Sequence, residues 1–245
     1  MPRDYPECEA ACAWMQGLSE SERERVRADL HRVTVDAGGM VCRRGELAHS
    51  WVGVIDGLVK IASVSVSGKA LTYTGVAPGG WFGEGTLLKR ERWRYDVIAL
   101  RRSHIGFLPA DTFFWLLDRS LDFNRTIVNQ LNERLGQFIG QLQIDRLSGA
   151  DERVARTVAA MFHPVLYPGV DRWLRISQEE LGYLCGLSRQ RVNRALRRLS
   201  ERGLLRLRYG GIEVPDLQAL RDYESADDEN RGDDRAPSAS VPAEI

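Results

Sequence analysis

The clearest pattern of apolar and polar positions lies between residues 177 and 203. Four apolar residues there follow the spacing i, i+3, i+4 and i+7: Val192, Ala195, Leu196 and Leu199. This spacing places them on one buried face of a helix. A shorter helix is expected before it, because Ser177 and Glu180 form a capping box and Gly186 can supply a sharp turn with positive φ. The pattern predicts two helices joined by a tight turn.

The other face and first turn of the second helix carry side chains that can contact base edges: Arg189, Gln190, Asn193, Arg194 and Arg197. Arginine pairs with guanine through two hydrogen bonds, and glutamine or asparagine pairs with adenine in the same way. Ser188 can cap this helix. A plain αα-hairpin with a solvated basic face is the alternative. The short turn and the many donors together favour a helix-turn-helix that binds double-stranded DNA.

Two short β-type runs follow, at residues 204–208 and 212–214, with Tyr209-Gly210-Gly211 between them. Such a pattern predicts a two-stranded hairpin. A hairpin directly after the second helix is typical of a winged helix. Arg206 and Arg208 on it are candidates for phosphate contacts, which position a protein on DNA without specifying sequence.

The pattern is different between residues 33 and 108, where short β-type runs alternate with glycines. Regular short strands with glycine turns predict a sandwich or jelly roll. A short helical pattern precedes it around Trp14, and Ser19 with Glu22 forms a capping box for a helix that reaches about Leu30. Pro109 ends the β region, and a short helix is expected at residues 112–117.

A long helix is then predicted from about residue 121 to residue 147. Its apolar residues step by four, four, three and four positions: Ile127, Leu131, Leu135, Phe138 and Leu142. A near-heptad stripe of this length requires a partner, which predicts the helical axis of a homodimer. Residues 149–151 are the expected hinge, with Asp151 as the cap of a helix over residues 152–162. Residues 163–170 form a loop with two prolines.

Composition limits the classes that remain. The chain has 245 residues, enough for two domains, and 43% hydrophobic with 28% charged residues is an ordinary balance for a soluble protein. The formal net charge is zero, so DNA binding follows from distribution alone: residues 189–208 contain eight arginines and one acidic residue. The acidic segment 224–245 is predicted to be disordered.

Neither a membrane-spanning run of about 20 apolar residues nor the apolar core of a signal peptide stands out in the sequence. We therefore expect a cytoplasmic protein. Its four cysteines, at positions 8, 12, 42 and 185, are then expected to be thiols.

The order of these elements over about residues 19–223 resembles the Crp/Fnr family of bacterial transcription regulators. Four stretches carry the resemblance: Arg44-Gly45-Glu46, Ile55-Asp56-Gly57-Leu58-Val59, Gly79-Gly80-Trp81-Phe82-Gly83-Glu84 and residues 177–203. The resemblance implies an α+β fold with an N-terminal jelly-roll-like β roll, a long dimerisation helix and a C-terminal winged helix-turn-helix. It divides the chain into an N-terminal extension (1–18), a cyclic-nucleotide-binding-like sensor domain (19–118), the dimerisation helix (119–148), the DNA-binding domain (149–223) and the tail (224–245).

The resemblance also implies functional contacts. The family's three base-reading positions match Arg189, Gln190 and Arg194, and many members have Glu where this chain has Gln190. Glu only accepts hydrogen bonds, whereas Gln also donates, so the common half-site of the family is not assumed. A homodimer would read palindromic sites, and residues 163–172 match the loop through which activating members contact RNA polymerase. A plain connector is the alternative for that loop.

In members that bind cyclic AMP, a Gly-Glu pair and a later Arg-Ser or Arg-Thr pair hold the ribose and the cyclic phosphate. Gly83-Glu84 matches the first pair. The second does not match: either Trp93 takes the arginine position, or Arg94 takes it with Tyr95 in place of the hydroxyl residue. Both departures argue against cyclic AMP in its usual pose. The candidate contacts for a nucleotide-like effector are Gly83, Glu84, Arg92, Arg94, Phe138 and Gln141; a solvated loop is the alternative for Arg92 and Arg94.

Other sensory chemistries have weaker support. Cys8, Cys12 and Cys42 lack the close spacing of iron–sulfur members, and the histidines at positions 31, 49, 104 and 163 suggest a haem ligand only by residue type. A cupin-like metalloenzyme fused to a DNA-binding module would need several histidines and a Glu on adjacent strands. The sequence therefore predicts a regulator without a metal site or enzymatic activity. An effector-independent or redox- or haem-sensing regulator remains as the alternative.

Overall fold

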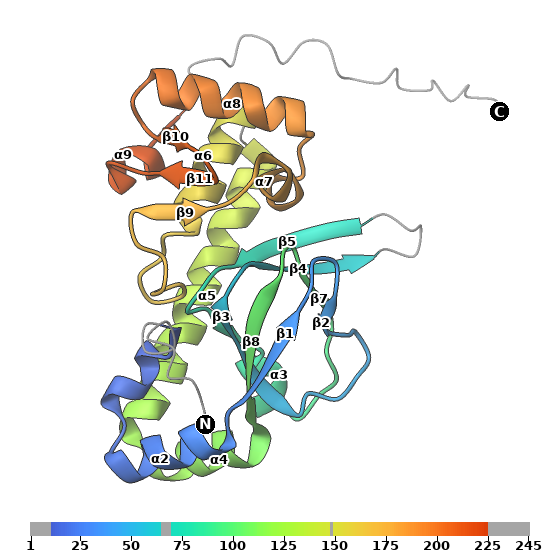
Figure 1. The fold of residues 1–245 in the computed structure, drawn as a ribbon, viewed down its shortest axis with the longest axis vertical. Helices are drawn as coiled ribbons and strands as arrows, with labels where there is room; N and C mark the ends of the chain where they lie inside the picture. The colour runs from blue at the N-terminus through green and yellow to red at the C-terminus, as the bar shows by residue number, and fades with distance from the viewer. Residues whose placement is uncertain (1–10, 65–69, 148, 225–245) are drawn as a thin grey trace, which may run out of the picture.

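The computed structural model describes residues 11–64, 70–147 and 149–224. Its fold is mixed α+β, with a β roll, a long helix beside it and a group of small helices at the far end (Figure 1). The predicted disordered tail and Cys8 lie outside the described residues.

The β roll is built from two antiparallel four-stranded sheets. The first has the order β1 (His31–Val35), β8 (Ser103–Pro109), β3 (Ser50–Asp56) and β6 (Trp81–Phe82). The second has the order β2 (Met40–Cys42), β7 (Asp96–Ala99), β4 (Val59–Val64) and β5 (Ala70–Val76). Gly53 lies on β3 where an added Cβ would come within 2.3 Å of the Trp81 ring, so the absence of a side chain lets that indole lie against the strand. The predicted jelly-roll-like domain is confirmed.

Short helices close one end of the roll around a group of aromatic rings. These helices are η1 (Ala13–Gly17), α2 (Glu20–Asp29), α3 (Glu84–Leu88) and α4 (Ala110–Arg119). The predicted capping box is present at α2, where Ser19 accepts from the Glu22 amide and Glu22 accepts from that of Ser19. The rings of Trp14, Trp51 and Trp81 pack in tilted or edge-to-face arrangements with centroids 4.6 to 5.3 Å apart, which fixes η1 against the sheet.

The long helix α5 spans Leu121–Leu147, as the apolar stripe predicts. Its 27 residues make it about 40 Å long, and it runs from α4 along the side of the β roll to the group of C-terminal helices (Figure 1). It is followed by α6 (Ala150–Ala160). Asp151 does not cap α6, because the helix begins at Ala150 with Gly149 as N-cap. Instead Asp151 accepts a hydrogen bond of 3.0 Å from Arg198.

The remaining elements form the predicted winged helix-turn-helix. They are β9 (Trp173–Arg175), α7 (Gln178–Cys185), α8 (Arg189–Glu201), β10 (Arg206–Arg208), β11 (Gly211–Glu213) and α9 (Leu217–Arg221). The wing hairpin β10–β11 is extended by β9 into a three-stranded sheet. The loop before β9 is less exposed than its prolines suggest, because Leu166 and Tyr167 are buried.

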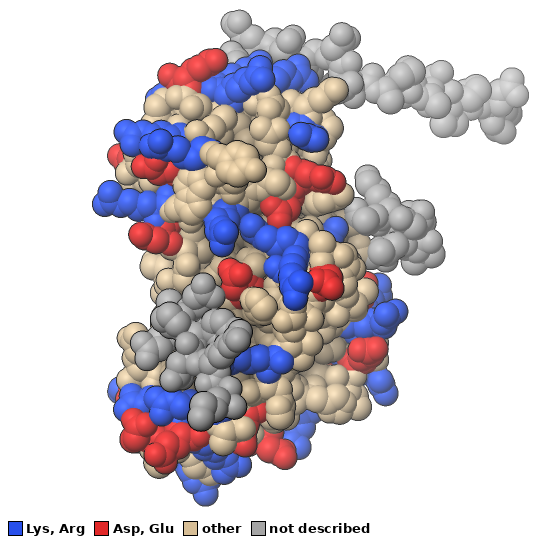
Figure 2. Space-filling model, viewed as in Figure 1, with Lys and Arg blue, Asp and Glu red and all other residues tan. Residues whose placement is uncertain are grey.

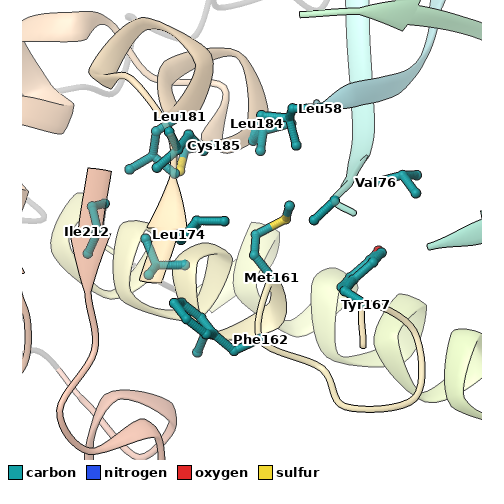
Figure 3. Close-up of a cluster of buried hydrophobic side chains, with 14 of the residues drawn as sticks. Leu58, Val76, Met161, Phe162, Tyr167, Leu174, Leu181, Leu184, Cys185 and Ile212 are labelled. Atoms are coloured by element: carbon teal, nitrogen blue, oxygen red, sulfur yellow. The ribbon is translucent and has the colours of Figure 1, made fainter. Parts of the chain in front are cut away.

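One continuous apolar core joins the β roll to the winged helix-turn-helix. Leu58 and Val76 from the roll lie beside Met161, Tyr167 and Leu184 (Figure 3). An added Cβ at Gly75 would come within 2.9 Å of Leu184, so α7 packs closely against β5. Polar contacts flank this core: Glu180 pairs with Arg101, whose guanidinium also donates to the Arg175 carbonyl. The two domains therefore pack as one body.

Candidate nucleic-acid interface and sensor site

The tight turn between α7 and α8 follows from a few residues. Ser177 and Glu180 make the predicted capping box at the start of α7, and Gly186 ends the helix in the left-handed region at φ 63°. An added Cβ at Gly182 would lie 2.9 Å from the Leu187 carbonyl oxygen. Glycine at this position therefore allows the turn to fold back against α7, which sets how α8 projects.

The apolar stripe of α8 is buried as predicted, which leaves the opposite face exposed. Ser188 caps the helix by accepting a hydrogen bond from the Arg191 amide at 3.4 Å. Asn193 is half-buried, and its side-chain amide donates to Gln178 at 3.0 Å, which ties α8 to α7. Asn193, one of the predicted base-reading residues, therefore also links α8 to α7.

The exposed face of α8 carries four arginines: Arg189, Arg191, Arg194 and Arg197. Within the described part of the chain, none of the four forms a salt bridge within 4.0 Å. The first turn of the helix contains no acidic residue, although the helix dipole favours negative charge there. Lys and Arg side chains gather at the upper edge of the molecule, where α8 lies (Figure 2). The N-terminal end of α8 is therefore electrostatically suited to an anion.

Other arginines of this region have partners within the protein. Arg206 and Arg208 on the wing both contact Glu213, at 3.4 and 3.2 Å. Arg198 pairs with Asp151, and Arg202 donates to the Tyr223 hydroxyl. The sequence alone does not distinguish among the eight arginines of residues 189–208. The structure shows which of them contact other residues of the protein and which are exposed without a salt bridge to a described residue.

The predicted sensor residues Gly83 and Glu84 lie at the start of α3. Gly83 has φ 90°, and Glu84 is only 2% exposed. The Glu84 carboxylate pairs with Arg134 of α5 at 3.1 Å, and the same guanidinium donates to the Trp81 carbonyl at 2.7 Å. Burial alone would lower the pKa of Arg134, but the Glu84 carboxylate raises it above its ordinary value. Arg134 thus stays charged inside the roll.

Sequence reasoning missed Arg134, although a signal for it exists. Gln130, Arg134 and Gln137 are spaced i, i+4 and i+7, a polar stripe beside the apolar one on the same helix. Gln130 donates to the Trp81 carbonyl at 2.5 Å, and Gln137 donates to the Tyr167 hydroxyl at 3.2 Å. This stripe attaches α5 to its own β roll and to the loop before β9.

The other predicted effector contacts point elsewhere. Arg94 is largely exposed and pairs with Glu91, and Arg92 donates to the Gly45 carbonyl at 2.9 Å. Trp93 between them is buried. Tyr95 is also enclosed, and burial together with the nearby Glu84 raises the pKa of its hydroxyl to about 12. The structure thus brings Trp93, rather than either arginine, next to Gly83.

The predicted dimer stripe divides at Ile127. Ile127 is 2% exposed and packs with Phe123 and Leu116 in the core of its own chain, so it has no surface to offer a partner. The stripe then opens to solvent: Leu131, Leu135, Phe138 and Leu142 are 36 to 58% exposed. Phe138 is thus exposed here, while Gln141, the other predicted effector contact on α5, is half-buried.

The described cysteines lie in two separate apolar cores. Cys12 packs in the aromatic core with the short helices, whereas Cys42 and Cys185 belong to the core shared by the two domains. Burial raises the pKa of the Cys42 thiol and brings that of Cys185 to about 12. Among the described residues, no three His, Cys, Asp or Glu side chains come together as a metal site would need.

Comparisons with known proteins agree with this architecture. Residues 32–120 match the model of the cyclic nucleotide-binding domain, and residues 152–223 match that of the Crp-like helix-turn-helix domain. The chain belongs to the Crp/Fnr family. It is a DNA-binding transcription regulator of this type.

Individual relatives are distant but extend over most of the chain. The cyclic AMP receptor protein of Thermus thermophilus is 26% identical over 206 residues, which cover 84% of this chain and 94% of the relative. The transcriptional regulator SdrP of the same species is 28% identical over 190 residues, or 74% and 85% of the two chains. FixK2 from Bradyrhizobium japonicum, at 18% identity, shares the fold with a TM-score of 0.65 over 80% of this chain and 98% of its own.

SdrP of Thermus thermophilus and Vfr of Pseudomonas aeruginosa, both similar to this chain, are transcriptional regulators. Within the described residues, no helix is both long enough and apolar enough to span a membrane.

Proposed function

We propose that this chain acts in the cytoplasm as a homodimer that recognises palindromic promoter DNA with its two α8 helices. The observation that carries this proposal is the row of four exposed arginines on the outer face of α8, none of which forms a salt bridge with a described acidic side chain: Arg189, Arg191, Arg194 and Arg197. The proposal includes no enzymatic activity. It keeps the division into an extension (1–18), a sensor domain (19–118), a dimerisation helix (119–148), a DNA-binding domain (149–223) and a tail (224–245).

The residues of α8 have different roles in this proposal. Arg189 lies in the first turn, the end of a recognition helix that enters the major groove. Arg194 lies five residues further, about 7.5 Å along the axis, so the two can contact different base pairs of one half-site. Gln190 lies between them and both donates and accepts hydrogen bonds. Asn193 and Arg197 complete the face.

Phosphate contacts surround this base-reading face. Ser188 at the N-terminus of α8 is exposed, as are Arg206 and Arg208 on the wing. Contacts of this kind fix the register of a protein on DNA and make binding depend on salt. The two protomers would then read inverted half-sites about one helical turn apart.

The dimer axis is proposed along the exposed part of the α5 stripe. Leu131, Leu135, Phe138 and Leu142 form it, and Ile139 is another large apolar side chain of this segment, 53% exposed. Exposed apolar side chains in succession along one helix are characteristic of an interface rather than of a solvated surface. Ile127 is not part of the proposed seam because its own chain buries it.

Contact with RNA polymerase is proposed for the exposed part of residues 163–172. Pro164, Val165, Asp171 and Arg172 are exposed, whereas Leu166 and Tyr167 anchor the loop in the shared core. An anchored loop with an exposed tip can present a rigid surface to a partner. Substitutions at the exposed positions should reduce activation and leave DNA binding unchanged, and equal loss of both would refute this contact.

An effector in the β roll is the second candidate, favoured by one observation. Among the described residues, Glu84 Oε2 and Arg134 Nη1 are buried with no hydrogen-bond partner, and buried polar atoms normally have one. The proposed contacts are those predicted from the sequence, namely Gly83, Glu84, Arg92, Arg94, Phe138 and Gln141. A regulator that works without an effector is the competing hypothesis, and for cyclic nucleotides the close packing of Trp93 against Gly83 favours it.

The DNA-binding proposal is tested with a selected library of sites at several salt concentrations. Arg189→Ala and Arg194→Ala should each cost about 1–3 kcal/mol and relax the preference at a single base pair. Arg206→Ala should weaken all sequences about equally and flatten the salt dependence. Arg125→Ala, an exposed arginine at the start of α5, is the matched control and should change neither. Uniform weakening by all three test variants would show that these residues hold only the DNA backbone.

The dimer is tested separately by sedimentation. Leu135→Asp places a charge in the proposed seam, where burial without a partner is strongly unfavourable, and should give a monomer. Leu71→Asp introduces the same change at a residue of β5 that is 55% exposed and should leave the dimer intact. A dimeric Leu135→Asp variant would place the seam elsewhere.

A further inference from the structure

The space beside the Gly83–Glu84 turn is filled by a side chain of the same molecule. An added Cβ at Gly83 would come within 2.3 Å of Trp93 Cη2, so the indole lies directly against the Gly83 backbone. The ring is 5% exposed and contacts Phe82 and Tyr95 edge to face, with centroids 6.2 and 5.6 Å away. A ligand at this turn would have to take the place of the indole.

The backbone around Trp93 holds the indole in place. The Trp93 amide donates to the Glu46 carbonyl at 2.8 Å, and the Trp93 carbonyl accepts from the Gly45 amide at 2.9 Å. Arg92 adds a third bond to this neighbour, because its guanidinium donates to the Gly45 carbonyl. These bonds fix the backbone from which the indole projects, and expelling the indole would expose its apolar surface to water.

The polar groups of the turn are also occupied from within the chain. Arg134 reaches from α5 to the Glu84 carboxylate at 3.1 Å, and Arg134 and Gln130 both donate to the Trp81 carbonyl. A ribose hydroxyl would compete with a guanidinium for the same carboxylate, and a charge-assisted bond between ions is the stronger of the two. Glu84 is therefore engaged by the dimerisation helix instead of by a ligand.

The two unpartnered atoms, Glu84 Oε2 and Arg134 Nη1, do not change this conclusion. A buried acceptor and a buried donor can each be satisfied by a small hydrogen-bonding group such as a water molecule. A cyclic nucleotide needs the volume of a purine, a ribose and a phosphate. It also needs a cation for its phosphate, whereas Arg94 points outward to Glu91.

We infer that Trp93 and Arg134 exclude cyclic nucleotides from the β roll, and that this chain binds its DNA sites without one. The two residues act as specificity determinants: Trp93 fills the ligand volume, and Arg134 supplies from the chain itself the link between the sensor turn and α5. The second part of the inference rests on the proposed DNA-binding function, whereas the first part does not.

The first test uses the purified full chain with cyclic AMP or cyclic GMP. A ligand that binds only the native state stabilises it by about 2.7 kcal/mol when the ligand concentration is 100 times the Kd. This stabilisation raises the melting temperature of the protein, so a thermal-shift assay detects binding. We expect no shift at about 1 mM of either nucleotide, where a site of micromolar affinity would be saturated. A shift that grows with concentration would overturn the exclusion.

The same samples are titrated with a selected DNA site. The Kd for DNA should be equal with and without nucleotide, within about twofold, since coupling changes affinity by at least about fivefold in typical allosteric proteins. DNA binding that appears only with nucleotide would overturn the inference. Absence of DNA binding under all conditions would refute the proposed function, while the thermal shift would still decide the exclusion.

A second test examines the filled volume itself with indole as probe. Trp93→Ala should lower the melting temperature, and added indole should restore part of the loss, because apolar cavities of this kind bind matching aromatic molecules. Trp115→Ala removes the same side chain from a half-buried position on α4 and should show no rescue. If indole fails to stabilise Trp93→Ala, the claim of a ligand-sized volume is wrong. Should Trp93→Ala not fold, the wild-type titrations remain decisive.

Discussion

Arginine side chains are central to both the outer face of α8 and the Gly83–Glu84 turn, but they are exposed in the first region and enclosed in the second. On α8, Arg189 and Arg194 are exposed and form no salt bridge with described residues. At the turn, Arg134 is largely enclosed, with a side chain 12% exposed, and is bonded to Glu84 and to the Trp81 carbonyl. A solvated guanidinium costs the fold little and keeps its donors for DNA, whereas a buried one must find its partners inside the chain. The first region is open to a ligand and the second is closed.

The largest effect should come from opening the closed region. Arg134→Ala leaves the Glu84 carboxylate buried without its cation, and breaking a buried pair in this way should cost about 3–5 kcal/mol. Urea unfolding of the wild type and the variant measures the loss. A double variant, Glu84→Gln with Arg134→Met, removes both charges and should be much less destabilised. Equal losses for the single and double variants would show that the ion pair is not what closes the site.

A smaller loss is expected from Gly83→Ala. The new methyl group would collide with Trp93, and the residue would keep φ 90°, where side chains are strained. Strain of this kind should cost about 1–3 kcal/mol. Gly85→Ala is the matched control two residues on, since a Cβ there meets nothing within 4 Å and alanine favours the helix by about 0.5–1 kcal/mol. A stable Gly83→Ala protein would mean that Trp93 can move aside.

A third variant tests whether the wing arginines beside the exposed face of α8 contact DNA. Glu213 contacts both Arg206 and Arg208, and all three side chains are at least partly exposed. Glu213→Gln should leave stability within about 0.5 kcal/mol of the wild type, because exposed pairs contribute little. It should tighten DNA binding and steepen its salt dependence by about one to two phosphate contacts. Fluorescence anisotropy at several salt concentrations provides both numbers, and unchanged affinity and slope would show that the wing arginines do not contact phosphates.

The smallest predicted effect is a pH dependence of the unfolding free energy, which we attribute to His163. Burial lowers the pKa of His163 despite the opposing Glu133, and its Nδ1 accepts from the Val165 and Leu166 amides. A lowered folded-state pKa means that the unfolded chain binds the proton first, so stability is complete above about pH 6.5 and falls below it. His163→Gln should flatten the slope of unfolding free energy between about pH 7 and 5.5. An unchanged slope would show that His163 does not contribute.

The sequence predicted what local spacing determines. Both capping boxes, the buried stripe of α8, the glycine turn at Gly186 and the bounds of α5 follow from residues a few positions apart, and each is present. The family resemblance identified Gly83 and Glu84 as candidate sensor residues, and in the structure they lie at the start of α3.

Contacts between distant residues were not predictable in this way. Arg134 lies 50 positions from Glu84. The polar stripe of Gln130, Arg134 and Gln137 marks a face of α5, but it does not indicate which distant residue Arg134 contacts. Ile127 continues the apolar stripe in sequence but is buried by its own chain, because the base of α5 packs into the aromatic core. In the sequence, Trp93 stands out only as a residue that replaces the family's phosphate-binding arginine. Its packing against Gly83 is visible only in the structure. Such pairs depend on the tertiary fold.

The core shared by the β roll and the winged helix determines how the molecule can be divided. Since Leu58 and Val76 pack with Met161 and Leu184 (Figure 3), a fragment cut at the hinge near Gly149 would carry this apolar surface uncovered into water. Such a surface promotes aggregation. Chemical denaturation of the whole chain should accordingly follow a single cooperative transition, because neither half retains a complete interior once the other has unfolded.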